Sequence, residues 1–229
     1  MLDRIKSQRI INKIVMHLEL KMKLKITLYN KKLIKRSNIT IKDFKDFQFL
    51  KEFNSKFNSN IKDINVATID LTDKNLGNDI FEYLVNTWFS KIKELILSNN
   101  KISDIKLLKD IKFEKLEKLW LNNNKIKDIN LLNQIDFKEL KELTFYKNEI
   151  SDINALYNTR FGKLEKLSFA KNKISDIKVL ERVNFKELKE LYLNGNRIKS
   201  INNLENVDFP KLTRLFLNSN EISDIISIY

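Results

Sequence analysis

The chain has 229 residues, and 42% of them are hydrophobic, which is enough apolar material for a packed core and argues against a disordered chain. It contains no cysteine, so a disulfide framework, a thiolate zinc site and a cysteine nucleophile are excluded. The formal net charge of +13 is uneven: residues 1–60 hold 15 basic and 5 acidic side chains, whereas residues 61–229 hold 28 and 25.

The N-terminal segment shows helical rather than repeating patterns. Apolar residues recur at helical spacing between Ile11 and Leu33, with lysines among them, and an aromatic-rich stretch follows from Phe44 to Phe57. Charged side chains interrupt the apolar run of residues 10–20, so we expect neither a signal-peptide core nor a membrane span. These patterns predict a basic helical cap in a cytoplasmic protein.

Beyond residue 60 the sequence has a period of 24 residues. Two columns of identical residues recur at this spacing. The asparagines are Asn100, Asn124, Asn148, Asn172, Asn196 and Asn220. The phenylalanines are Phe89, Phe113, Phe137, Phe161, Phe185 and Phe209. A degenerate first unit spans about residues 66–91, with a helical stretch over 78–88, and six regular units follow from about residue 92.

Each unit reads L-x-x-L-x-L-x-x-N-x-I-x-x-I, as in Leu116, Leu119, Leu121 and Asn124. This pattern resembles the leucine-rich repeat family. The resemblance implies an α/β solenoid, with a curved parallel sheet on the concave side and short helices or turns on the convex side. It implies that residues 61–229 form a leucine-rich repeat domain and that residues 1–60 form its N-terminal helical cap.

The alternation of apolar residues predicts which side chains enter the core. In residues 94–98, Leu95 and Leu97 point inward and the other three face outward. The chain has three glycines and one proline, so its turns must be stabilised in another way. We expect buried asparagine amides to form hydrogen bonds with the unpaired backbone groups at these turns. The phenylalanine column is expected to form a structural spine between the sheet and the convex side.

An acidic or hydroxyl side chain precedes the next apolar stretch of each unit. The residues are Asp104, Asp128, Asp152, Asp176, Ser200 and Asp224. Such residues suit the N-cap of a short convex helix. Calcium binding is the alternative, but one carboxylate per unit supplies too few oxygens for a calcium site, so we expect no metal and no cofactor.

Two outward columns of the predicted sheet alternate in charge. The first is Glu94, Lys118, Glu142, Lys166, Glu190 and Arg214. The second is Lys93, Glu117, Lys141, Glu165, Lys189 and Thr213. Because neighbouring strands then pair unlike charges, this half of the face is predicted to be nearly neutral, which argues against nucleic acid as its partner.

The remaining outward columns supply the candidate binding site. Aromatic residues on a solvated sheet face are typical interface anchors, although they are also good strand formers. The candidate anchors are Trp120, Tyr146, Tyr192 and Phe216. The candidate contacts around them are Ile96, Asn122, Lys147, Lys171, Asn194 and Asn218. Small Ser168 and Ala170 predict a shallow dip that suits a peptide or a partner loop better than a small molecule.

No motif predicts catalysis. His17 is the only histidine, and the three scattered glycines form no phosphate-binding loop. We therefore predict a noncatalytic protein-interaction module that binds an unidentified protein or peptide on its concave face, with its oligomeric state open.

The N-terminal and C-terminal segments leave alternative interpretations of function and assembly open. Residues 10–35 are similar to an F-box, a helical module that precedes leucine-rich repeats in ubiquitin-ligase adaptors, and this similarity implies a substrate adaptor. Basic side chains between Lys21 and Arg36 suggest binding to nucleic acid or an anionic surface, although seven of the 43 basic residues are arginine. No polar helix follows Ile222, so we expect either truncation or an interface with another chain.

Overall fold

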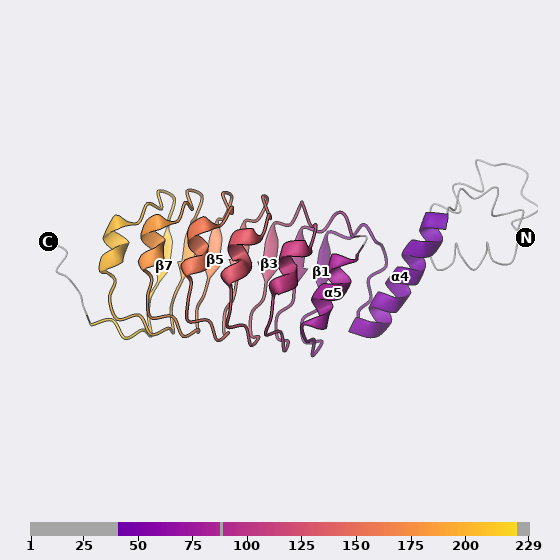
Figure 1. Ribbon diagram of the computed structural model, residues 1–229, viewed down its shortest axis with the longest axis horizontal. Coiled ribbons are helices and arrows are strands. Elements are labelled where there is room, and N and C mark those ends of the chain that lie inside the picture. The colour runs from indigo at the N-terminus through magenta and orange to yellow at the C-terminus, as the bar shows by residue number, and fades with distance from the viewer. Residues whose placement is uncertain (1–40, 88, 224–229) are drawn as a thin grey trace, which may run out of the picture. The chain divides into compact units, whose positions relative to one another are not determined.

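The computed structural model describes residues 41–87 and 89–223 (Figure 1). The basic and F-box-like segments predicted within residues 10–36 lie outside the described residues, as does Asp224. The chain divides into two compact units, residues 1–64 and 65–229.

In the first unit, helix α4 spans Ile41–Phe57. One face of the helix is buried, and its residues follow helical spacing: Asp46, Leu50, Phe53 and Phe57. The helix ends where Asn58 takes a positive φ of 45°. The N–H of Ser59 then donates to the carbonyl of Asn54, five residues back, as in a Schellman-type helix end.

The second unit is a parallel sheet of seven strands in sequence order, with short helices on the other side (Figure 1). The strands are β1 (Thr68–Asp70), β2 (Glu94–Ile96), β3 (Lys118–Trp120), β4 (Glu142–Thr144), β5 (Lys166–Ser168), β6 (Glu190–Tyr192) and β7 (Arg214–Phe216). Between regular units each strand residue pairs with the residue one repeat later in the chain, as Leu119 does with Leu143. The leucine-rich repeat solenoid predicted from the period is confirmed.

In the described part of the chain, the helical side consists of α5 and five 3-10 helices. They are α5 (Asp79–Val85), η2 (Lys106–Asp110), η3 (Asn130–Gln134), η4 (Asn154–Asn158), η5 (Lys178–Arg182) and η6 (Asn202–Asn206). Helix α5 lies within the stretch 78–88 predicted as helical but is shorter. The aspartate column precedes the 3-10 helices by two residues instead of one. Asp104 still accepts a hydrogen bond from the N–H of Lys106, the first helical residue, at 2.9 Å.

The core of the repeat unit lies between these two layers. Leu95, Leu119, Leu143, Leu167 and Leu191 of the strands are fully buried, and all six members of the phenylalanine column are buried as well. Leu215 occupies the same column in β7, but 39% of its surface is exposed. Within the described ranges, no helix has the length and apolar character needed to cross a membrane.

Candidate functional site on the concave sheet face

The asparagine column fixes the turn at the end of each strand. The side chains from Asn100 to Asn196 are buried, and Asn220 is partly buried. Asn148 is typical: its Oδ1 accepts from the N–H of Ile126 at 3.0 Å, and its Nδ2 donates to the carbonyls of Leu121 at 2.9 Å and Phe145 at 3.1 Å. Because two of these partners belong to the preceding unit, each asparagine joins two repeats and sets their spacing.

One position of each unit has a left-handed backbone, and in the regular units it is the residue just before the buried asparagine. The column is Asn75, Asn99, Asn123, Lys147, Lys171, Gly195 and Ser219, with φ between 50° and 69°. Glycine and asparagine tolerate this conformation best, whereas a lysine Cβ makes it costly. Two adjacent units therefore place lysine where the fold favours a different residue.

Ion pairs join the charged columns of the strands, as the alternation predicted. In the first column the pairs are Lys118 with Glu94 at 2.7 Å, Lys166 with Glu142 at 2.9 Å, and Arg214 with Glu190 at 2.6 Å. In the second column Glu117 lies between two lysines, accepting from Lys141 and Lys93, each at 2.8 Å. Hydrogen bonds from these two ammonium groups lower the pKa of Glu117 to about 2.

A hollow of about 390 Å³ lies beside these pairs on the concave face. Its lining residues come from β3 to β6 and the residues that follow these strands. They are Trp120, Asn122, Glu142, Thr144, Tyr146, Lys166, Ser168, Ala170, Tyr192 and Asn194. The small side chains of Ser168 and Ala170 leave the space, and Trp120, Tyr146 and Tyr192 are the large side chains around it. This volume is near the lower end of the range for ligand pockets.

The aromatic rings at the hollow are held by their neighbours. Tyr192 stacks on Phe216 with centroids 4.6 Å apart, and its hydroxyl donates to Glu190 at 2.8 Å. The ammonium of Lys166 lies 5.7 Å from the centre of the Tyr192 ring, and that of Lys171 lies 5.3 Å from the centre of the Tyr146 ring. Because rings and cations already contact the ring faces, the face is preorganised before any partner binds.

The structure brings only some of the predicted site residues to the hollow. Trp120, Asn122, Tyr146, Tyr192 and Asn194 line it. Lys147 and Lys171 lie at the adjoining strand ends, while Ile96, Phe216 and Asn218 are not part of its lining. Asn122 is also internally bonded, because its Oδ1 accepts from the N–H of Tyr146 at 2.9 Å.

Sequence reasoning missed one feature of the lining, namely its buried polar atoms. Thr144 is only 5% exposed. Its Oγ1 and the Nε1 of Trp120 are buried without a hydrogen-bond partner in the described part of the chain. Ser98, Ser168 and Ala170, predicted to face outward, are also buried. Their side chains are short, so larger neighbours in the same columns cover them.

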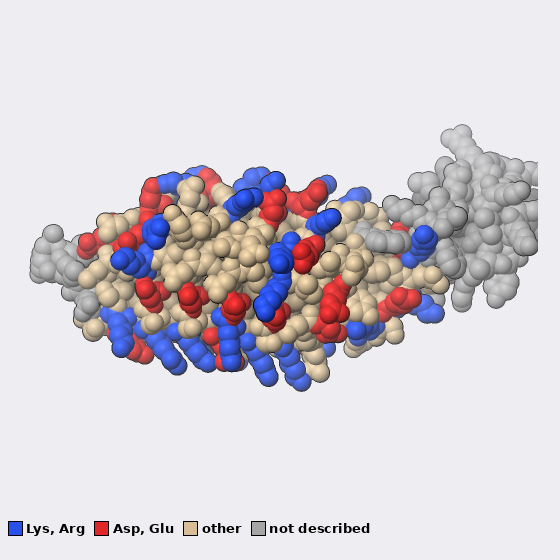
Figure 2. Space-filling model, viewed as in Figure 1, with Lys and Arg blue, Asp and Glu red and all other residues tan. Residues whose placement is uncertain are grey.

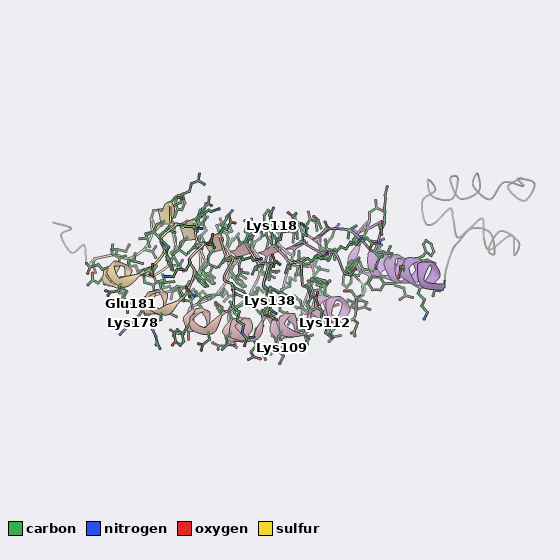
Figure 3. All side chains as sticks on the ribbon, turned by 90° about the horizontal axis from the view of Figure 1, so that it is seen from above. Lys109, Lys112, Lys118, Lys138, Lys178 and Glu181 are labelled. Atoms are coloured by element: carbon green, nitrogen blue, oxygen red, sulfur yellow. The ribbon has the colours of Figure 1, made fainter. Side chains whose placement is uncertain are left out.

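The opposite face of the repeats carries a mixture of charges. Figure 2 shows acidic and basic side chains interspersed on the face of the 3-10 helices, with a row of basic side chains along one long edge. Figure 3 places Lys118 of β3 on the strand side and Lys109 of η2 on the helix side. Among the described residues, no group of three or more His, Cys, Asp or Glu side chains could hold a metal ion.

Comparison with known proteins identifies the family. The sequence model of the family of leucine-rich repeats (2 copies) matches residues 90–134, 114–158, 162–206 and 186–228. These matches cover more than half of the chain, which therefore belongs to the leucine-rich repeat family. The repeats indicate a protein-interaction module. No curated protein matches the chain.

Two solved structures show how far the similarity extends. The chain is similar to an internalin of Listeria monocytogenes, with 32% identity over 62% of this chain and 39% of that chain, and a TM-score of 0.51. It is also similar to internalin C2 of the same organism, with 22% identity over 77% of this chain and 85% of that chain, and a TM-score of 0.55. The second similarity shows the fold alone. The chain spans about two fifths of the length of the first internalin.

Proposed function

We propose that this protein is a noncatalytic binding module that recognises a protein or peptide through the hollow on its concave face. The observation that carries the proposal is the group of three aromatic side chains, Trp120, Tyr146 and Tyr192, around a space floored by small residues. Aromatic anchors of this kind dominate the energetics of protein interfaces. The internal pairing of the charged columns also supports it, because the face then has little net charge to favour nucleic acid. We place this function in the cytoplasm, as the lack of cysteine suggests.

The experiment is capture of partners from the native cell by the full chain and by three single variants. Trp120→Ala and Tyr146→Ala remove anchors, whereas Tyr157→Ala removes an exposed aromatic residue of η4 on the helical side. We expect a partner that wild type and Tyr157→Ala retain and that both anchor variants lose at least about tenfold.

Circular dichroism of each variant shows whether the repeats remain folded. Equal capture by all four proteins would contradict the concave site. Loss with Tyr157→Ala alone would move the site to the opposite face.

A further inference from the structure

Lys147 and Lys171 are the cationic groups that border the hollow without an acidic partner. Both side chains are exposed, and no acidic group of the described residues lies within 4.0 Å of either ammonium. Glu149, the acidic residue nearest in sequence to Lys147, pairs with Lys173 at 2.9 Å and Lys127 at 3.8 Å. The two cations are therefore available to a group from outside the chain.

The backbone holds these two lysines side by side at the edge of the hollow. The N–H of Lys147 donates to the carbonyl of Ala170, and the N–H of Lys171 donates to that of Asn194, each at 2.8 Å. Ala170 and Asn194 line the hollow. Gly195 leaves room for the neighbouring side chain, because a Cβ there would lie 3.2 Å from Cγ of Lys171. The backbone of both lysines is consequently fixed at the edge of the hollow, and the ammonium of Lys171 also lies over the Tyr146 ring.

Both lysines also occupy a strained backbone position. Their φ angles are 55° and 52°, where the other units use Asn75, Asn99, Asn123, Gly195 and Ser219. A residue kept in such a conformation against its preference points to a function at that place. Since the two lysines lie in consecutive units and both border the hollow, the strain coincides with the candidate site.

Charge and shape together define the partner. Resting on the function proposed above, we propose that the hollow takes a neutral side chain of an extended peptide segment, and that Lys147 and Lys171 bind an acidic side chain next to it. Charged residues of β2 to β7 are paired internally, as Glu142 is with Lys166, so they offer little to a second charge. The partner is thus an acidic peptide segment with one neutral anchor.

A nucleic acid fits the same surface less well. Single strands bind through bases stacked on open aromatic faces together with cations along the backbone. Here Lys171 lies over Tyr146, while Phe216 and Lys166 both contact the ring of Tyr192. Both tyrosine rings therefore already have contacts within the chain, and the neighbouring charged columns hold five acidic residues beside six basic ones.

The test uses a random peptide library displayed on phage, selected on the full chain. We expect enrichment of sequences in which Asp or Glu neighbours an aromatic or aliphatic residue. The selected peptides, made synthetically, should bind the double variant Lys147→Asn, Lys171→Asn at least about tenfold more weakly. Asparagine occupies the same backbone position in other units, so this variant is expected to fold.

The matched control is the double variant Lys101→Asn, Lys125→Asn, which loses the same charge from two exposed lysines outside the lining. It should retain peptide affinity within about twofold. Added salt should weaken peptide binding strongly only for proteins that keep both Lys147 and Lys171. Peptides without acidic enrichment, or equal affinity for the two double variants, would overturn the acidic-partner inference. Failure to select any peptide would overturn it too.

The same measurements separate this inference from the function proposed above. If Trp120→Ala weakens peptide binding but the Lys147, Lys171 double variant does not, the concave site stands and the acidic partner falls. If neither variant weakens binding, both proposals fail. Binding of oligo(dT) more tightly than any selected peptide, through the same two lysines, would show a nucleic-acid site in place of a peptide site.

Discussion

At the scale of single residues, the asparagine column contributes more to stability than its polar character suggests. Replacing Asn148 with alanine leaves the N–H of Ile126 and two carbonyls without their partner in a buried place. We expect a loss of about 1–3 kcal/mol in the free energy of unfolding, measured by urea denaturation. Asn130→Ala, at an exposed position of η3, is the control and should change stability by less than about 0.5 kcal/mol. Equal effects would contradict the role of the column.

At the left-handed position of Lys147 we expect a substitution to raise the free energy of unfolding. Lys147→Asn relieves a backbone conformation that lysine disfavours, and the side chain removed has no ion pair among the described residues. We expect the free energy of unfolding to rise by up to about 1 kcal/mol. Lys125→Asn, one residue after an asparagine of the column and not at a positive φ, should not stabilise the protein. A lower melting temperature for Lys147→Asn would contradict this prediction, because it would mean that the lysine side chain stabilises the fold.

The aromatic side chains differ from their sequence prediction in one respect. The sequence places Trp120 and Tyr192 on a solvated sheet face, where replacement with alanine is expected to leave stability nearly unchanged. Tyr192, however, stacks on Phe216 and donates a hydrogen bond to Glu190. Its removal should therefore cost about 1 kcal/mol. This cost makes Trp120 and Tyr146 the better choices for binding experiments.

At the scale of strands, the charged columns make stability depend on pH. The pKa of Glu117 is about 2 in the folded protein, against an ordinary value of 4.5, because it accepts hydrogen bonds from Lys141 and Lys93. A lowered pKa contributes stability that is fully present above about pH 4.5 and is lost as the pH falls toward 2. Because these side chains are partly exposed, solvent screens each pair and its contribution to stability is small.

Glu117→Gln should accordingly lower the urea midpoint at pH 6 and have a smaller effect at pH 2.5. Glu114→Gln is the control, because Glu114 is a nearby exposed residue with no ion pair among the described residues. A difference between wild type and Glu117→Gln that grows on acidification would contradict the sign. High salt should reduce the effect at pH 6.

The elements also show what the sequence could and could not predict. The period determined the strands, the asparagine turns and the pairing of Lys118 with Glu94, because all three repeat with it. The 3-10 helices were not distinguished from α-helices; five residues between two turns fit the tighter helix. The positive φ of Lys147 and Lys171 could have been inferred from Gly195 in their column.

The depth of the hollow could not be predicted in the same way. Whether Thr144 and Ser168 are exposed depends on the side chains across three strands, not on their own unit. The columns did indicate the small floor and the aromatic side chains around it, but not the buried atoms of Thr144 and Trp120.

At the scale of the whole repeat array, stability should depend on how completely each unit is covered by its neighbours. Repeat proteins behave as chains of units stabilised by their interfaces. Leu143 of β4 is fully buried between adjacent strands, whereas 39% of Leu215 in β7 is exposed. Both are leucines of the same core column, so the same substitution at each compares β4 with β7 while the side chain removed stays the same.

We expect Leu143→Ala to cost about 2–5 kcal/mol and Leu215→Ala less than half of that, because the first opens a cavity and the second removes a side chain already partly in water. Urea denaturation followed by circular dichroism measures both, and the slope of the transition reports whether the array still unfolds as one cooperative unit. Equal costs would mean that β7 is covered as completely as β4 in solution. A shallower slope for Leu143→Ala would mean that the units on either side of β4 unfold separately, so that coupling through the central strands is what makes the array cooperative.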